Sequence, residues 1–255
     1  MSAKLGKGIV EASVLAGGFG TRLQTVIADR PKSMAEVGSK PFLEWLVLQL
    51  RAKGILRIIL CTGYLHEAVE GYFQDGRKWG LQIDYSHEEE ALGTGGALRL
   101  ALAQMRDSTV LVLNGDSYCR FTMDALAGTH FGHSAAATMY LVRMDDCRRF
   151  GAVELNGDNS VRTFVEKPAE QRGCCINAGV YLIERKAIES IPENRKVSLE
   201  REVFTSMIGR GLFGMVGGGP FIDIGTPESY ASAVEFMHSE ANLKSNLLPS
   251  GGEVI

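Results

Sequence analysis

Short apolar runs alternate with amphipathic segments through the first half of the chain. Four apolar runs have the length of strands: 9–15, 56–61, 81–85 and 109–113. Three segments between them have the periodicity of helices: 41–54, 65–73 and 94–105. The first helix is expected to begin at Pro41 and end at Gly54, and its apolar face consists of Phe42, Trp45, Leu46 and Leu50. This alternation predicts right-handed βαβ units, and therefore an α/β fold with a mostly parallel sheet between helices.

The second half has a different pattern. Residues 152–155 and 161–165 flank the polar stretch 156–159, which predicts a β-hairpin. Three further elements are expected: a strand that begins at 177–181, a helix over 199–208 and a last helix capped by Thr226 with Pro227 at its first position. The tail 246–255 is expected to be flexible. The chain contains no internal repeat or linker, so a single domain over 1–255 is predicted.

Composition excludes several classes of function. A net charge of −3 gives no basic face for a polyanion, so no nucleic-acid partner is expected. No apolar run approaches the ~20 residues that span a bilayer, so no membrane association is expected. The five cysteines include no C-x-x-C pair, and free buried thiols in a reducing cytoplasm are the expected state.

A glycine-rich turn follows the first apolar run. Gly17, Gly18 and Gly20 allow a tight turn whose N–H groups face an anion, and Thr21-Arg22 and then Lys32 follow. Two cations next to such a turn predict that the anion is a phosphate chain. A Walker loop is excluded because Thr21-Arg22 stands where Lys-Ser or Lys-Thr is needed. The dinucleotide fingerprint is excluded because Leu23 occupies the position of its third glycine.

The pattern G-G-x-G-T-R, with Pro31-Lys32 about ten residues later, resembles the sugar-nucleotide pyrophosphorylases, which are nucleotidyltransferases acting on sugar 1-phosphates. Further segments match this family in the expected order: LGTGGAL (92–98), NGDS (114–117), EKP (166–168), NAGVY (177–181) and IDIGTPESY (222–230). The resemblance covers nearly the whole chain. It implies a Rossmann-like mixed sheet with an inserted β-hairpin that binds sugar, a mainly nucleotide-binding half over 1–115 and a mainly sugar-phosphate-binding half over 116–245.

The resemblance also implies roles for individual residues. Catalysis is assigned to Arg22, Lys32, Asp116 and Lys167. Nucleotide binding is assigned to Leu15, Ala16, Gly17, Gly18, Gly20, Thr21, Arg22, Gly93, Thr94, Asn114 and Gly115. Sugar-phosphate binding is assigned to Glu166, Lys167, Asn177 and Gly179. Mg²⁺ is the implied cofactor, with Asp116 and Asp223 as its protein ligands.

Elementary chemistry explains these residue types independently. Magnesium, Arg22, Lys32 and Lys167 would screen the repulsion between two phosphate-bearing substrates and stabilise the charge of the transition state. Magnesium needs only one or two carboxylates besides phosphate oxygens and water. Other interpretations stay open for single residues. Asp116 is also typical of a turn, and Asn177 is typical of a side chain that satisfies backbone groups. Residues 88–90 are typical of a solvated acidic run, and their position near the base segment leaves a minor role at the ribose or base open.

Details of the motifs indicate the substrates. LAGGFGTRLQ, the KPFLEWL helix start and the ALGTGGAL–VLNGDS pair look closest to the branch of the family that uses GTP and D-glycero-α-D-manno-heptose 1-phosphate. We therefore expect a cytoplasmic guanylyltransferase that produces a GDP-heptose and pyrophosphate for bacterial surface glycans, and a homo-oligomer is compatible with the sequence. Backbone groups of 92–96 are expected to read guanine, unless these glycines only pack a helix. The alternatives are a hexose-1-phosphate guanylyl-, uridylyl- or cytidylyltransferase and a catalytically silent regulatory subunit.

Overall fold

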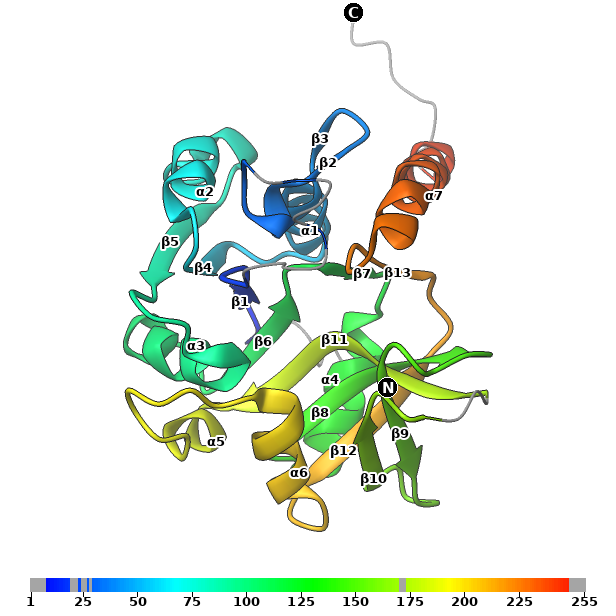
Figure 1. Ribbon diagram of the computed structural model, residues 1–255. Helices are drawn as coiled ribbons and strands as arrows, with labels where there is room; N and C mark the ends of the chain where they lie inside the picture. Colours follow the sequence, from blue (N-terminus) through cyan, green and yellow to red (C-terminus); the bar gives the residue numbers. More distant parts are fainter. Residues whose placement is uncertain (1–7, 19–22, 24–26, 28, 170–172, 248–255) are drawn as a thin grey trace, which may run out of the picture.

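A computed structural model describes residues 8–18, 23, 27, 29–169 and 173–247, the last seven of these by backbone only. Four parallel strands form the first half of its central sheet, in the order β6-β1-β4-β5 (Figure 1). Their bounds are Glu11–Leu15 for β1, Arg57–Thr62 for β4, Gln82–His87 for β5 and Thr109–Asn114 for β6. All four predicted strands of this half are therefore present. Since β1 and β6 pair with Leu15 opposite Asn114, both strands end at the same edge of the sheet.

The second half extends the same sheet with antiparallel pairs. The long strand β11 (Cys174–Glu184) runs antiparallel to β6, β8 and β9, and β12 runs parallel to β8. The remaining strands of this half are β8 (Ala137–Met144), β9 (Gly151–Leu155), β10 (Val161–Glu166) and β12 (Leu212–Gly217). The pair β9–β10 is the predicted hairpin. The sheet is therefore mixed, as expected, and it is continuous across both halves of the chain.

Two small antiparallel pairs lie outside the main sheet. They are β2 (Glu36–Val37) with β3 (Lys40–Pro41), and β7 (Ser117–Cys119) with β13 (Phe221–Asp223). The second pair matters for function, because it places Asp223 opposite Ser117, next to Asp116. The backbone N–H of Ile224 also donates to the carbonyl of Asp116 at 2.9 Å.

Helices cover both faces of the sheet because its strands alternate their side chains. In β6, Leu111 and Leu113 belong to one buried cluster, and Val110 and Val112 belong to the other. Helices α1 (Phe42–Ala52), α2 (His66–Phe73), α4 (Met123–Gly132) and α7 (Pro227–Leu247) contribute to the first cluster. Helices α3 (Gly93–Ala101), α5 (Arg185–Glu189) and α6 (Phe204–Met207) contribute to the second. Within the described residues, no helix combines the length and apolar character needed to cross a membrane.

Some predicted elements differ from the structure. The helix expected over 199–208 is a π-helical turn, Leu199–Val203, followed by the single turn of α6. The helix expected over 94–105 is α3 and a short 3₁₀ turn, Leu102–Gln104. Strands β8 and β12 and helix α4 were not predicted. The expected flexible tail lies outside the described residues from 248 onward.

The expectation of five free thiols is wrong. Cys147 and Cys174 form a disulfide, with their Cα atoms 6.3 Å apart, while Cys61, Cys119 and Cys175 are free. The two bonded cysteines are separated by 27 residues, so their spacing in the sequence gave no sign of contact. The bond joins the loop between β8 and β9 to the first residue of β11.

A buried ionic network lies at the opposite end of the parallel strands. The Arg57 guanidinium is bonded to the Glu11 carboxylate, to Asp84 Oδ2 at 2.7 Å and to the carbonyl of Gln104 at 2.9 Å. The Glu11 side chain is 2% exposed, and its second oxygen accepts the backbone N–H of Arg106 at 3.0 Å. These bonds join β1, β4 and β5 to the segment that precedes β6.

We expect Arg57→Met to destabilise the protein by about 3–5 kcal/mol, because Glu11 would keep a buried charge without its cation. Urea unfolding at neutral pH measures the change. The double variant Glu11→Met/Arg57→Met removes both charges and should recover much of the loss. A loss below about 1 kcal/mol for the single variant would show that the network behaves like a solvated surface pair.

Candidate active site

Two neighbouring cavities open at the edge where β1 and β6 end. The first has a volume of about 420 Å³ and the second about 360 Å³. Four residues line both cavities: Lys32, Asn114, Asp116 and Glu200. Because the cavities share these walls, two ligands bound in them would meet at Lys32 and Asp116.

The first cavity brings together most of the residues predicted for nucleotide binding. It is lined by Leu15, Ala16, Gly17, Gly18, Gly93, Thr94, Asn114 and Gly115. The predicted residues Gly20, Thr21 and Arg22 lie outside the described part of the chain. Gly115 has to be glycine here, because a Cβ atom would lie 2.7 Å from the carbonyl oxygen of Leu15. The end of β6 therefore packs directly on the end of β1.

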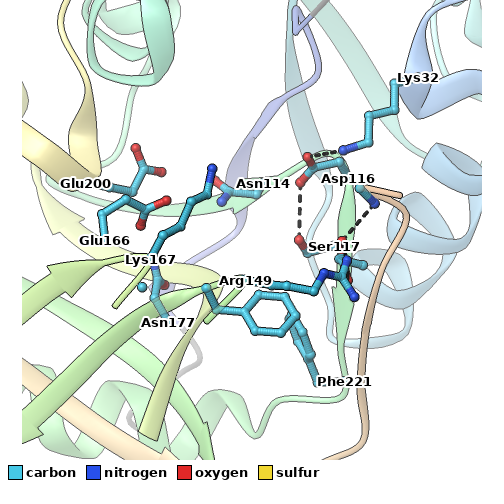
Figure 2. A pocket seen from close by; sticks show the side chains of 14 residues that line it. Lys32, Asn114, Asp116, Ser117, Arg149, Glu166, Lys167, Asn177, Glu200 and Phe221 are labelled. Atoms are coloured by element: carbon cyan, nitrogen blue, oxygen red, sulfur yellow. Dashed lines mark hydrogen bonds and ion pairs between the residues drawn. The ribbon is translucent and has the colours of Figure 1, made fainter. Parts of the chain in front are cut away.

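The second cavity brings together most of the residues predicted for the sugar phosphate and the metal. Lys32, Asp116, Glu166, Lys167, Asn177 and Asp223 all line it. Figure 2 shows the labelled members of this set, Lys32, Asp116, Glu166, Lys167 and Asn177, which come from separate strands and loops. Gly179 does not line either cavity. Its φ of +71° forms an irregularity in β11, and its backbone packs on the side chain of Asn114.

Asp116 lies in the turn between β6 and β7 and is paired with Lys32. The Lys32 ammonium is 2.7 Å from Asp116 Oδ2, and the Ser117 hydroxyl is 3.2 Å from Oδ1 (Figure 2). Desolvation opposes the charged form of Asp116, but the ammonium prevails and holds the pKa of Asp116 below its ordinary value. Asp116 therefore remains a carboxylate at neutral pH.

Asp223, at the end of β13, is paired with Arg149. One guanidinium nitrogen of Arg149 lies 3.0 and 2.8 Å from the two carboxylate oxygens of Asp223. The backbone N–H of Gly225 also donates to Asp223 Oδ2, at 2.7 Å. Each of the two carboxylates expected to bind metal thus has one cationic partner in this structure.

This arrangement fits a magnesium ion that also contacts a phosphate. Two carboxylates, Asp116 in the turn before β7 and Asp223 at the end of β13, line one cavity, and Mg²⁺ commonly takes one or two carboxylates plus phosphate oxygens and water. No group of three or more metal-binding side chains occurs among the described residues. The two aspartates would therefore need oxygens from a ligand to complete the coordination.

Lys167 follows β10 and extends into the second cavity. Its backbone has a φ of +57°, and its N–H donates to the carbonyl of Phe150 at 3.0 Å. No carboxylate in the described part of the chain pairs with its ammonium group. This cation is therefore available for an anionic ligand, unlike Lys32 and Arg149.

Asn177 has a structural role in addition to its place in the cavity wall. Its amide nitrogen donates to the hydroxyl of the buried Tyr181 at 2.8 Å, and its oxygen accepts the backbone N–H of Gly179 at 3.1 Å. One N–H and one lone pair of the amide remain for a ligand. In Asn114, by contrast, the buried Oδ1 atom has no partner among the described residues.

Part of the segment 92–96, whose backbone was expected to bind the base, is paired within the protein. The N–H groups of Gly95 and Gly96 both donate to the carbonyl of Val197, at 2.8 and 3.3 Å. A Cβ atom on Gly96 would lie 2.5 Å from the carbonyl oxygen of Arg195. These glycines therefore allow close packing of α3 against 195–199, which is the alternative that the sequence left open.

Comparison with known proteins identifies the family of the chain. The profile of the family described as Nucleotidyl transferase matches residues 11–240. The chain belongs to this family. The family resemblance of the motifs and the expected enzyme class, a nucleotidyltransferase, are thereby confirmed.

The relatives of this nucleotidyltransferase are named for different sugar substrates. Mannose-1-phosphate guanylyltransferase of Mycobacterium tuberculosis is 38% identical over 244 residues, which cover 94% of the chain and 66% of that protein. D-glycero-alpha-D-manno-heptose 1-phosphate guanylyltransferase of Aneurinibacillus thermoaerophilus is 36% identical over 225 residues, covering 88% and 96%. The crystal structure of HddC from Yersinia pseudotuberculosis with GMP-PN superposes with a TM-score of 0.77 at 32% identity, covering 90% of the chain and 100% of HddC.

The two cavities contain further residues that were not assigned from the sequence. Glu88, Ser33 and Lys196 line the first cavity, and Arg149, Phe150 and Phe221 line the second. Glu200 lines both and accepts a hydrogen bond from the Thr94 hydroxyl at 2.8 Å. Only Glu88 had a signal in the sequence, which was its position beside the segment 92–96.

Proposed function

We propose that this nucleotidyltransferase transfers a guanylyl group from GTP to a sugar 1-phosphate, with D-glycero-α-D-manno-heptose 1-phosphate as its sugar substrate. The two adjoining cavities that meet at Lys32 and Asp116 carry the proposal, because they fit two phosphate-bearing ligands whose phosphates meet. Both relatives described above are named as guanylyltransferases. The chain covers 96% of the heptose 1-phosphate guanylyltransferase and 66% of the mannose-1-phosphate guanylyltransferase. The fuller coverage favours heptose 1-phosphate as the substrate.

Mannose 1-phosphate is the second candidate. It is favoured by the 38% identity to the mycobacterial relative, compared with 36% for the heptose relative. Under either substrate, the product would be a GDP-sugar for bacterial surface glycans. We assign mainly nucleotide binding to 1–115 and mainly sugar-phosphate binding to 116–245, and Lys32, Lys196 and Glu200 cross this division.

The proposed reaction is an in-line displacement at the α-phosphorus of GTP. An oxygen of the sugar phosphate forms a bond to that phosphorus, and the bond to the oxygen that bridges the α- and β-phosphates breaks, so pyrophosphate leaves. The attacking group is already an oxyanion, so no strong general base is required. Lys32, at the junction of the cavities, would neutralise charge on the reacting phosphates, and Lys167 would hold the sugar phosphate. Asp116 and Asp223 would hold Mg²⁺, which would bind phosphate oxygens and withdraw charge from them.

The cellular setting is also a proposal. GTP and sugar phosphates are cytoplasmic metabolites, so we place the enzyme there, without nucleic-acid or membrane partners. Disulfides are rare in reducing compartments, and the structure contains the Cys147–Cys174 bond, so the location needs a direct measurement. Cell fractionation followed by immunoblotting of the protein provides it. The mass of the protein in solution would test for a homo-oligomer.

Glu88 is the residue that best supports a preference for guanine. It follows β5 and lines the first cavity, and one of its carboxylate oxygens accepts the N–H of Leu92 at 2.9 Å. The other oxygen lies against the backbone of Gly17 and Gly63, where a Cβ atom would come within 2.7 and 2.9 Å of it. Guanine presents N1–H and N2–H donors on one edge, and a carboxylate accepts from both. Adenine has an acceptor at N1, which would face this carboxylate without a hydrogen bond.

We expect Glu88→Gln to lower kcat/KM for GTP by roughly tenfold or more, because each charge-assisted hydrogen bond contributes about 1.5–3 kcal/mol. Inosine triphosphate lacks the N2 amino group, so the wild-type protein should prefer GTP to it and Glu88→Ala should prefer neither. Burial raises the pKa of Glu88, and guanine binding needs the charged form of its carboxylate. The KM for GTP should therefore fall as pH rises through that pKa. Glu89→Gln is the matched control. If Glu88→Ala kept the wild-type ratio of kcat/KM for GTP to kcat/KM for inosine triphosphate, Glu88 would have no role in base recognition.

One assay decides the proposed function. Release of pyrophosphate is measured for GTP, ATP, UTP and CTP, each against heptose 1-phosphate, mannose 1-phosphate and glucose 1-phosphate. GTP with the heptose should give the largest kcat/KM. A larger kcat/KM with mannose 1-phosphate would identify mannose 1-phosphate as the sugar substrate. A preference for UTP or CTP would contradict the guanylyl assignment. No turnover with any pair, together with measurable binding of nucleotide, would favour a regulatory subunit.

A further inference from the structure

Arg149 is the cation whose role the proposed reaction does not yet explain. It lies in the loop between β8 and β9, where it binds Asp223 and lines the second cavity (Figure 2). We propose that Arg149 exchanges partners: it holds Asp223 before the metal binds, and it binds the phosphate of the sugar substrate once the metal takes Asp223. This inference rests on the proposed function and adds a substrate-binding residue to it.

The contacts of Asp223 favour such an exchange. The Arg149 guanidinium occupies both carboxylate oxygens, at 3.0 and 2.8 Å, and the N–H of Gly225 occupies Oδ2 as well. A divalent ion on the same carboxylate would lie in contact with the guanidinium, and like charges at that distance repel strongly. The ion and Arg149 therefore compete for Asp223. Lys32 stands in the same relation to Asp116.

The side chain of Arg149 can leave Asp223 at little cost. It is 45% exposed, and partly exposed ion pairs contribute little to stability. Its only other hydrogen bond in the described structure is to the Ser229 hydroxyl, at 3.2 Å. The guanidinium also lies 5.2 Å from the centre of the Phe150 ring, a face along which it can turn without losing all contact.

The backbone of Arg149, in contrast, is held next to the sugar-phosphate element. The carbonyl of Phe150 accepts the N–H of Lys167 at 3.0 Å, and Gly151 pairs with Glu166. On the other side, the Cys147–Cys174 disulfide ties the loop to β11. The exchange thus needs only a rotation of the side chain, and its destination is already close to Lys167.

The charge in the second cavity makes a phosphate the natural new partner. Its described walls carry four carboxylates and three cations, namely Asp116, Glu166, Glu200 and Asp223 against Lys32, Arg149 and Lys167. When a divalent ion neutralises two of the carboxylates, the guanidinium loses its partner and the cavity gains positive charge. A phosphate monoester dianion then fits the guanidinium, whose planar donors bind two phosphate oxygens at once.

The experiment compares Arg149→Met with the matched control Arg148→Met. Arg148 is the adjacent residue, and its guanidinium pairs with Asp146 and does not line the cavity. Binding of Mn²⁺ is titrated by electron paramagnetic resonance without substrates, and steady-state kinetics are measured with GTP and the best sugar 1-phosphate. Arg149→Met should bind Mn²⁺ several-fold more tightly than the wild type. It should also raise the KM for the sugar phosphate by roughly tenfold or more and change the KM for GTP little.

The combination of tighter metal binding and weaker sugar-phosphate binding is specific to the exchange. Arg149→Lys should recover part of the sugar-phosphate affinity, since it keeps the charge but loses the planar donors. Unchanged or weaker Mn²⁺ binding in Arg149→Met would overturn the proposal, and so would an unchanged KM for the sugar phosphate. The same shifts in Arg148→Met would also overturn it. If the wild-type protein turns over no sugar 1-phosphate, the proposed function fails and the Mn²⁺ titration alone decides the role of Arg149.

Discussion

Asp116→Asn and Asp223→Asn should each lower kcat/KM by roughly 10²–10³-fold, the cost typical of removing one preorganised electrostatic contact to a transition state. Asparagine preserves the size of the side chain but removes the charge that a metal requires. Each substitution also releases a cation, Lys32 or Arg149, which cannot replace a divalent ion between two phosphates. The loss should be smaller at high magnesium concentration, because weaker binding of the ion is then partly overcome by mass action.

The control for these variants is Asp146→Asn. Asp146 pairs with Arg148 and does not line either cavity. Its substitution by asparagine therefore makes the same change of charge away from the site. Pyrophosphate release at several magnesium concentrations measures the effect, and circular dichroism confirms that each variant folds. Near-normal rates for both site variants at low magnesium would exclude these aspartates as metal ligands.

Lys32→Met and Lys167→Met should have large but different effects. Lys32 lines both cavities, and its side chain is only 14% exposed. Its loss should therefore lower kcat and weaken the binding of both substrates. Lys167 lines only the second cavity, so its loss should mainly raise the KM for the sugar phosphate. Each lost charge-assisted hydrogen bond should cost tenfold or more, since it contributes about 1.5–3 kcal/mol.

Full kinetics with each substrate varied in turn distinguish the two lysines. Lys196→Met serves as a further comparison, because Lys196 lines only the first cavity and should affect mainly GTP. The assignment of Lys32 to the junction would be contradicted if Lys32→Met altered the KM of one substrate only and left kcat unchanged.

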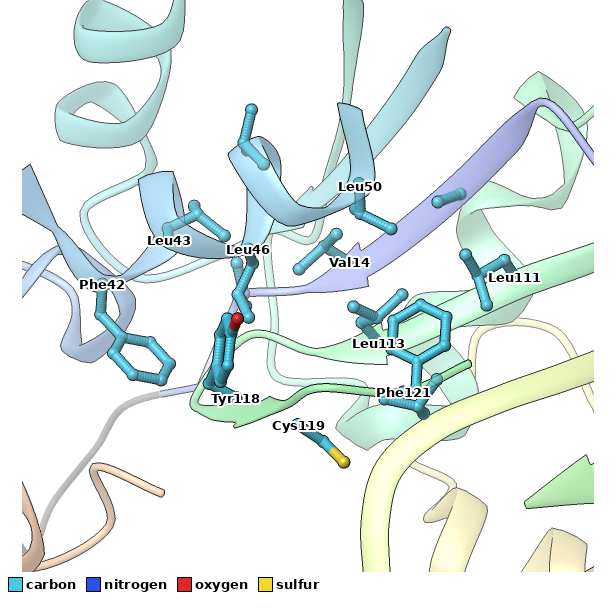
Figure 3. Close-up of a cluster of buried hydrophobic side chains, with 14 of the residues drawn as sticks. Val14, Phe42, Leu43, Leu46, Leu50, Leu111, Leu113, Tyr118, Cys119 and Phe121 are labelled. Atoms are coloured by element: carbon cyan, nitrogen blue, oxygen red, sulfur yellow. The ribbon is translucent and has the colours of Figure 1, made fainter. Parts of the chain in front are cut away.

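The sequence alone determined the first half of the fold and the place of the site. Helix α1 is an example: the spacing of Phe42, Leu46 and Leu50 predicted its buried face. All three belong to the same buried cluster as Val14 and Leu113, and Figure 3 shows Leu46 and Leu50 beside Val14. Such patterns are readable because they depend on residues a few positions apart. The site was located for a related reason, since parallel strands end at one edge of a sheet and the glycine-rich turn and Asp116 each follow such a strand.

Only the tertiary structure decided which side chains are partners. The Lys32–Asp116 pair joins residues 84 positions apart, and the Arg149–Asp223 pair joins residues 74 positions apart. The disulfide of Cys147 and the close packing of Gly96 on Arg195 are also contacts between distant segments. Local patterns carry no information about such contacts, because they depend on how the second half of the sheet returns to β6 through β11. For this reason the residue types of the candidate site were predictable, whereas the pairing of its charges was not.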